Sequence, residues 1–545
     1  MSDAAAVPAL VRQTPAAERT HLRAAQKWGG RILLFAILFA PSVWMLAKLP
    51  PLWRDADAYV QVTAPASIVT ILHYAPLYCF AARIPLYLGF AFDSLRAGSS
   101  LPPLHFFAEP TLSDSGVWLL LFLQHLAICL SSCLVIAAST RRLVVRAALA
   151  LVWATNPLFY SFAHCVGSET LSCIFLLLLG AAGIVIVRCG RRVSIRLWFA
   201  AGALISLAML TRHVNGVTAA LLPLAFGFAG ATRWLAARLR KPDRWRRWLM
   251  QKARQDLRRA LLAIGVGVVA IVAAHLTLRL VSYSAGIHYH SRLGYTFLFR
   301  MDYLGPLSAA ERAPLLERAA THSRTPHVQG VLEALRDAPS GAEEFDPMAV
   351  IRRWKAQQPA DADISDEQED EIFNETARAF LVAPTAPYLR AIARDCLRAA
   401  DTSLLDVVRQ LVQSTSWYFR DPSQMPKLAG LETFRDPRSV EVLENLRKEG
   451  YFKRWRHFTT TDSLALWLGL FTVAALQTRC RNAALFGYAL ALIVVGLLVV
   501  IATNILDRYQ VRFSLPAWQF TIVAVTLLVA MIAESLRRQA GVRLI

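Results

Sequence analysis

Long apolar runs recur along most of this chain and constrain its fold more than any other feature of the sequence. A helix that crosses a bilayer needs about 20 mostly apolar residues. The chain is therefore predicted to be an all-α polytopic membrane protein with about ten transmembrane helices. The ten windows are residues 31–49, 117–138, 143–163, 168–187, 195–211, 214–231, 260–281, 463–476, 483–503 and 515–533.

Composition and charge exclude other classes of protein. Hydrophobic residues make up 55% of the chain and charged residues 18%, whereas soluble chains are about 45–50% apolar and about 25% charged. The net charge of +21 would suit a nucleic-acid binder, but residues 282–458 hold 23 basic and 25 acidic side chains. The basic excess lies in short blocks between the apolar windows, as in membrane proteins. The sequence therefore predicts membrane lipids, and no nucleic acid, as partners.

The basic blocks also predict the orientation of the chain, because Lys and Arg favour the inner side of a membrane. Ten crossings that start inside place every basic segment, and both termini, on the inner side. These segments are residues 12–31, 141–146, 188–196, 233–259, 479–481 and 537–543. Residues 66–92 are apolar too, but Pro76 and Pro85 favour two broken half-helices at the outer surface over an eleventh span.

Three parts follow from this topology. Residues 1–281 form a transmembrane module whose first outer loop, 50–116, carries candidate catalytic groups. Residues 282–458 form an outer-side domain, and its apolar spacing near 3.6 predicts helices. Residues 459–545 form the C-terminal transmembrane helices. The eight cysteines show no CxxC pair, so buried free thiols are expected rather than a zinc or redox site.

Ionisable residues mark the predicted outer turns, where charges beside a bilayer are costly and commonly functional. After the first window, Asp55 or Asp57 could act as a general base or bind a hard metal; the alternative is a pair of hydrated loop acids. Glu169 opens the helix after the third window, where it could equally stabilise the helix dipole. Arg212 opposes the positive-inside pattern and suits a phosphate, with headgroup snorkelling as the alternative.

Two further clusters lie on the same predicted side. His288 and His290 follow the seventh window as an HxH pair, a weak metal signal that also fits ordinary interfacial histidines. Residues 507–516 offer Arg508 and Arg512 beside Tyr509, which suits either an anion site or an interfacial belt.

In their order, spacing and common side, these clusters resemble the GT-C superfamily of membrane glycosyltransferases, which use polyprenyl-phosphate sugars. The stretch around Arg212 looks like the Leu-Thr-Lys-Gly segment of the lipid A aminoarabinose transferases and its counterparts in protein O-mannosyltransferases. Arg508-Tyr509 with Pro516 looks like their Arg-Tyr-x-x-Pro segment. Ala56 departs from the paired acids of many members, which leaves open whether Asp55 or Asp57 is the base. The resemblance also rests on Asp55, Tyr59 and residues 76–78, 156–169 and 202–223.

The resemblance implies an inverting glycosyltransferase in a bacterial inner membrane, with its active site facing the periplasm. Asp55 would deprotonate or orient the acceptor hydroxyl, with Asp57 as the alternate and Glu169 as the second-loop acid. Arg212 and Arg508 would hold the lipid phosphate. Further substrate-binding residues would be Tyr59, His73, Tyr74, His213, His288, His290 and Tyr509.

The donor implied by the resemblance is a polyprenyl-phosphate sugar, and the acceptor is a glycan, a lipid or a protein. No fixed cofactor is implied, and a divalent metal stays open. The rival function is a lipid or polysaccharide transporter or flippase, whose charges would form a polar pathway. Such proteins commonly contain repeats and broken helices at mid-membrane, and the two halves of this sequence show no repeat. A polymerase or ligase of lipid-linked oligosaccharides is a further alternative.

Overall fold

The computed structural model is largely helical, with 84% of the described residues in helices. Two very short strands, β1 (Leu52–Trp53) and β2 (Cys165–Val166), form the one parallel pair among the described residues. The structure describes residues 16–542 except 72–73, 104–109, 240–243, 292, 324, 326, 339–345, 360–363, 422, 424, 449–457 and 479–481.

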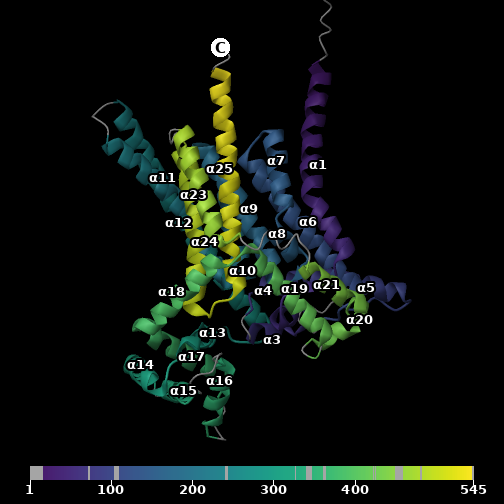
Figure 1. Cartoon of the computed structure of the whole chain (residues 1–545), viewed down its shortest axis with the longest axis vertical. Helices are drawn as coiled ribbons and strands as arrows, with labels where there is room; N and C mark the ends of the chain where they lie inside the picture. The colour runs from purple at the N-terminus through teal and green to yellow at the C-terminus, as the bar shows by residue number, and fades with distance from the viewer. Residues whose placement is uncertain are drawn as a thin grey trace, which may run out of the picture.

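Seven described helical segments are long and apolar enough to cross a membrane, so the chain is an all-α, membrane-spanning protein as predicted. Most of them run side by side as a bundle (Figure 1). The segments are Trp28–Lys48 of α1 (Ala16–Lys48), α6 (Asp114–Ser139), α9 (Ser168–Cys189), His213–Arg238, which includes α11 (Leu221–Arg238), α12 (Arg244–Ser284), α24 (Ala483–Leu506) and Val511–Gln539, which includes most of α25 (Leu515–Val542).

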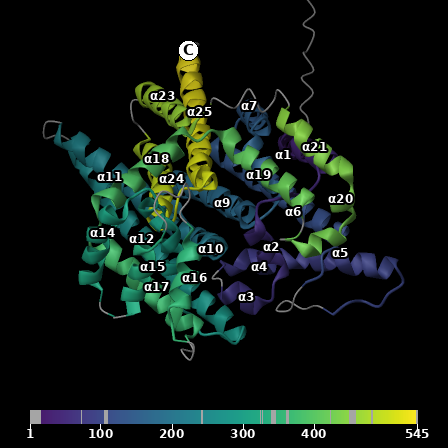
Figure 2. The ribbon, with the colours of Figure 1, turned by 60° about the horizontal axis from the view of Figure 1, so that its bottom comes forward.

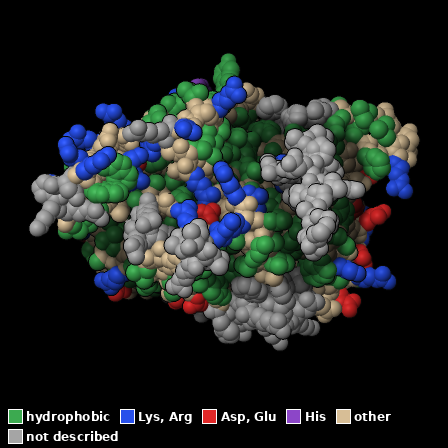
Figure 3. Space-filling model, turned by 90° about the horizontal axis from the view of Figure 1, so that it is seen from above, with side chains coloured by type: hydrophobic (Ala, Val, Ile, Leu, Met, Phe, Trp, Pro, Cys, Tyr) green, Lys and Arg blue, Asp and Glu red, His purple; other side chains and the backbone are tan. Residues whose placement is uncertain are grey.

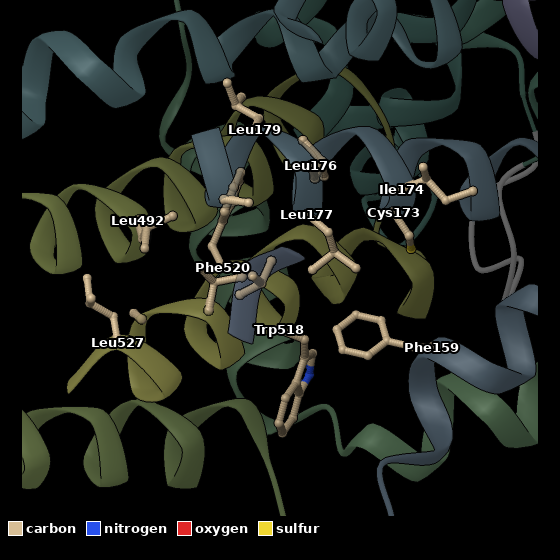
Figure 4. Packing of buried hydrophobic residues seen from close by; sticks show 14 of the residues in the cluster. Phe159, Cys173, Ile174, Leu176, Leu177, Leu179, Leu492, Trp518, Phe520 and Leu527 are labelled. Atoms are coloured by element: carbon tan, nitrogen blue, oxygen red, sulfur yellow. The ribbon is translucent and has the colours of Figure 1, made fainter. Parts of the chain in front are cut away.

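The bundle is held together by one large apolar cluster at its centre. Helices α9, α24 and α25 contribute Leu177, Leu492 and Phe520, and α8 (Pro157–Ala163) contributes Phe159; all are at most 1% exposed (Figure 4). Burying a side chain of this size is worth about 1.5–3 kcal/mol. Because α9 lies inside this cluster, both of its ends are fixed relative to the neighbouring helices.

The other three apolar windows are also helical. Window 143–163 is a pair, α7 (Leu143–Ala154) and α8, bent by 65° where Asn156 caps α8 and Pro157 follows. Window 195–211 is the shorter helix α10 (Ile195–Thr211), and window 463–476 lies within α23 (Thr460–Thr478). Counting the bent pair gives up to eight candidate spans, and ten crossings stay a prediction.

The segment 66–92 folds as short helices rather than as one span. Its described parts are α3 (Ala66–Ile71), α4 (Pro76–Ala81) and the start of α5 (Arg83–Arg96). Two half-helices were predicted, but the chain breaks again between α4 and α5, so three form. Helix α5 runs across the long helices rather than along them (Figure 1).

Residues 282–458 are helical where described, in line with their 3.6-residue spacing. A separate apolar core, which includes Phe297, Trp354 and Phe373, joins the first six of these helices, α13 to α18. The other helices of this region lie nearer the first outer loop and the ends of the bundle (Figure 2). The elements are α13 (Leu293–Arg300), α14 (Ala309–His322), α15 (His327–Arg336), α16 (Pro347–Ala356), α17 (Asp366–Val382), α18 (Ala386–Asp401), α19 (Leu404–Arg420), α20 (Glu432–Arg435) and α21 (Pro437–Lys448).

The ends of the bundle differ in a way that labelling can test. In Figure 1 the start of α1 and the end of α25 lie at one end, and the helices of residues 282–458 gather at the other. Glu367 and Trp245 are both exposed, on α17 and at the start of α12. In intact cells, a membrane-impermeant maleimide is expected to label Glu367→Cys from outside and Trp245→Cys only after permeabilisation. The reverse pattern would invert the predicted topology.

Candidate active site

The strand pair joins two loops that are far apart in the sequence. Leu52 pairs with Cys165 and Trp53 with Val166, which sets the loop that follows α1 against the start of α9. The hydroxyl of Tyr78 on α4 accepts a hydrogen bond from the Gly167 backbone N–H at 2.8 Å. As a result Arg54 Nη1 lies 2.6 Å from Glu169 Oε1, although the two residues are 115 positions apart.

Five charged side chains form a continuous network, here called the arginine–carboxylate cluster: Arg54, Asp55, Glu169, Arg212 and Arg512. Glu169 Oε1 accepts from Arg54 and from Arg212 Nη1, the latter at 2.9 Å. Asp55 accepts from Arg54 Nε at 2.8 Å and from Arg512 Nη1 at 2.6 Å. Three guanidinium groups face two carboxylates, so the cluster carries one surplus positive charge. Both partners are buried only in the Arg54–Glu169 pair, where removing one of them would typically cost about 3–5 kcal/mol.

Asp55 also begins a helix. Its Oδ1 accepts from the backbone N–H of Ala58 at 2.9 Å and so caps α2 (Ala56–Thr63). Burial raises the pKa of Asp55, but the charges of Arg54 and Arg512 outweigh it and lower the pKa to about 2. Asp55 is therefore ionised at neutral pH and, while both arginines hold it, is a weak base.

Asp57 has a different environment two residues further on. It is exposed, and its Oδ1 accepts a hydrogen bond from the hydroxyl of Tyr74 at 2.8 Å. Burial and the neighbouring Asp57 charge raise the pKa of Tyr74, so the phenol stays protonated and keeps donating. No described arginine lies within ion-pair distance of Asp57.

Helix α19 and the 3-10 turn η5 (Pro426–Gly430) hold the loop that follows α1 in place. The Ala56 backbone N–H donates to the Tyr418 hydroxyl at 3.0 Å, and the Trp53 N–H donates to Thr415 Oγ1 at 2.9 Å. The Tyr59 hydroxyl accepts from the Lys427 N–H at 3.0 Å. Residues 282–458 thus take part in positioning the cluster.

The structure brings together some of the residues predicted from sequence. Asp55, Glu169 and Arg212 meet in the cluster, and Asp57 and Tyr74 lie beside it. His213 follows Arg212 directly, at the start of the 3-10 helix η2 (His213–Ala220). His73 lies outside the described residues.

The other predicted residues make their contacts elsewhere. The Arg508 guanidinium lies 5.9 Å from the centre of the Phe299 ring, and the hydroxyls of Tyr509 and Thr402 are hydrogen-bonded. His290 Nε2 lies 2.7 Å from Asp370 on α17, and its Nδ1 contacts the carbonyl oxygen of His288. These contacts tie the loops at residues 288–290 and 508–509 to the helices of residues 282–458.

Sequence reasoning gave no individual role to two members of the cluster, Arg54 and Arg512. Arg54 directly precedes Asp55 in the loop 50–116, and Arg512 lies in the segment 507–516, so closeness in sequence to the predicted residues was the available signal. Arg508 was favoured as the phosphate ligand, but Arg512 is the residue that reaches Asp55. The chain forms the 3-10 turn η6 (Val511–Ser514) after α24, which directs Arg512 to the cluster.

Asp507 should make stability depend on pH. Burial raises its pKa to about 6, although Arg512 partly opposes this, whereas the carboxyl of an unfolded chain titrates near about 3.9. Between these values the folded state binds more protons, so stability falls as pH rises from about 4 to about 6, by up to about 3 kcal/mol. Unfolding midpoints in detergent across this range should show a smaller fall in Asp507→Asn than in the unchanged chain. Asp366→Asn, at an exposed position on α17, should show the same fall as the unchanged chain. Equal pH profiles for all three proteins would contradict the assignment.

No group of three or more His, Cys, Asp or Glu suited to a metal ion occurs among the described residues. The cluster carboxylates are instead engaged by guanidinium groups, whose planar forks also match phosphate. No protein-family model, no curated protein and no solved structure matches this chain.

Proposed function

We propose that this protein is a membrane glycosyltransferase of the GT-C type, which moves a sugar from a polyprenyl-phosphate carrier to an acceptor. The main supporting observation is the arginine–carboxylate cluster, which gathers three arginines from the ends of candidate membrane spans and from loops next to them. Ionisable groups at a membrane boundary are costly, so such a concentration favours a functional site. The cluster lies at the ends of helices rather than at mid-span, which favours an enzyme over a transport pathway.

Two features of the arginine–carboxylate cluster support binding of the lipid phosphate: its surplus positive charge and a hydrogen-bond donor that has no partner among the described residues. The cluster carries one surplus positive charge, and the buried Arg512 Nε has no hydrogen-bond partner among the described residues. An incoming phosphate would compete with Glu169 for Arg212 and with Asp55 for Arg512. Charge-assisted bonds of arginine to phosphate are among the strongest hydrogen bonds in proteins. Arg212 and Arg512 are therefore the proposed phosphate ligands.

Asp57 is the proposed general base, and Asp55 a positioning residue. The sequence favoured Asp55, but a carboxylate with a pKa of about 2 accepts a proton poorly at neutral pH. Asp57 is exposed to an incoming acceptor and is paired with a neutral phenol rather than with arginine. Asp55 would instead hold Arg54 and Arg512 until the phosphate replaces it.

The proposed reaction inverts the configuration at the anomeric carbon. The acceptor oxygen attacks that carbon from the side opposite the phosphate, and its bond forms as the carbon–oxygen bond to the phosphate breaks. The acceptor proton passes to Asp57, and the bonding electrons leave with the polyprenyl phosphate. Arg212 and Arg512 would stabilise the charge that develops on this leaving group. Placement in a bacterial inner membrane, with ten spans and the site facing the periplasm, is part of the same proposal.

One assay tests this function directly. The purified full-length protein in liposomes would be incubated with a panel of polyprenyl-phosphate sugars and a cell-envelope extract as acceptor. Release of polyprenyl phosphate with transfer of label to the extract would support the proposal. Movement of the intact lipid between leaflets without release would favour a flippase instead. Joining of lipid-linked oligosaccharides, with no use of single-sugar donors, would favour a polymerase or ligase.

A further inference from the structure

A basic pocket of about 610 Å³ lies at the end of the bundle opposite to the arginine–carboxylate cluster. Helix α9 connects the two places, because Glu169 stands in its first turn and Arg188 in its last. The pocket is built from the ends of helices that come from distant parts of the chain. Its lining residues include Arg141, Arg142, Arg188, Arg233, Arg537 and Arg538.

The pocket is strongly positive, because its described lining residues include six arginines and one acid, Glu534. Glu534 lies 3.8 Å from Arg188, and Arg233 is paired with the buried Asp256. No described carboxylate lies within ion-pair distance of the remaining arginines, Arg141, Arg142, Arg537 and Arg538. Figure 3, which views this end of the molecule, shows Lys and Arg side chains gathered around an acidic one near the centre of the face.

The pocket also lies where a membrane surface would be. The candidate spans α6 and α9 end beside it, α24 begins beside it, and the last span carries Arg537 and Arg538 in its final turns. Two apolar side chains close in sequence to lining residues are exposed: Val144, two residues after Arg142, is 81% exposed, and Leu536, directly before Arg537, is 51% exposed. An amphiphile whose anionic group entered the pocket could lay its chains along these side chains.

We propose that this pocket binds the phosphate group of an anionic phospholipid in the surrounding leaflet. The guanidinium groups of Arg141, Arg537 and Arg538 would receive the phosphate oxygens, which they match in charge and in planar geometry. Basic pockets between transmembrane helices commonly hold lipid headgroups. The exposed Val144 and Leu536 favour a lipid over free phosphate, which would leave them uncovered. This site is independent of the proposed transferase activity.

Thermal unfolding in a neutral detergent tests the proposal. Added phosphatidylglycerol should raise the unfolding midpoint of the full-length protein, because a ligand that binds only the folded state stabilises it. Phosphatidylcholine, whose headgroup has no net charge, should raise it much less. In the double variant with Arg537→Gln and Arg538→Gln, the apparent affinity for phosphatidylglycerol should fall by at least about tenfold, because two charge-assisted contacts are lost. Arg141→Gln should weaken it in the same direction.

A control with the same change of charge distinguishes binding in this pocket from non-specific electrostatic attraction of the lipid. Arg244 and Arg247 are exposed on the first turns of α12 and do not line the pocket. The pair Arg244→Gln and Arg247→Gln removes the same charge and should leave the phosphatidylglycerol response unchanged. Equal losses in the two pairs, or no loss in either, would overturn the proposal. Stabilisation by inorganic phosphate at the same concentrations would show a free-anion site and overturn the lipid assignment.

Discussion

Arg512→Ala is expected to reduce release of polyprenyl phosphate by about 10²–10³-fold, the effect of removing one donor that stabilises charge in a transition state. Arg512 is chosen because it joins the cluster through Asp55 at 2.6 Å and keeps an unpaired Nε among the described residues. Arg512→Lys should recover part of the activity, because an ammonium keeps the charge but loses the planar fork. Carrier release from a single-sugar donor is the measurement.

Arg508 provides the matched control for this prediction. It is a cation of the same type four residues away, but its guanidinium lies over the Phe299 ring rather than in the cluster. Arg508→Ala should therefore retain most of the activity. Equal losses in the two alanine variants would point to a general electrostatic effect of this loop. Full activity in Arg512→Ala would remove Arg512 from the proposed phosphate site.

The helices of this protein could be predicted because their signal is local and large. All ten apolar windows are helical, since an apolar run long enough to span a membrane must satisfy its backbone polar groups internally. Asp55, Glu169 and Arg212 could be singled out for a similar reason: charges next to apolar runs need partners. Their meeting in one cluster was expected from the predicted topology, which puts them on one side of the membrane, and the described contacts join them.

The partners within the cluster could not be predicted, because they depend on turns and long-range contacts. Arg508 and Arg512 are the same residue type in the same segment of the sequence. The 3-10 turn η6 determines which of them reaches Asp55. Arg54 contacts Glu169 because two residues of β1 pair with β2 across more than a hundred positions. Likewise, nothing in the sequence near Tyr418 indicates that its hydroxyl holds the backbone of Ala56.

Substitutions of Asp55 and Asp57, in the loop that follows α1, should distinguish the general base from the positioning residue. Asp57→Asn is expected to lower sugar transfer by about 10²–10⁴-fold, the usual contribution of a general base, while donor binding stays near normal. Protein stability should change little, because Asp57 is exposed and an acid in the first turn of a helix is worth only about 0.3–1 kcal/mol.

Asp55→Asn is the matched comparison, because asparagine caps helices as well as aspartate does and so preserves the start of α2. It removes the charge that holds Arg54 and Arg512, so its main effect should be on the concentration of donor required, with much of the maximal rate retained. Initial rates measured against donor concentration distinguish the two effects. If Asp55→Asn abolishes the maximal rate and Asp57→Asn does not, Asp55 is the base despite its low pKa. That outcome would require the incoming phosphate to draw Arg512 away from Asp55 before the acceptor loses its proton, because only a carboxylate freed of its guanidinium partners can take up that proton at neutral pH.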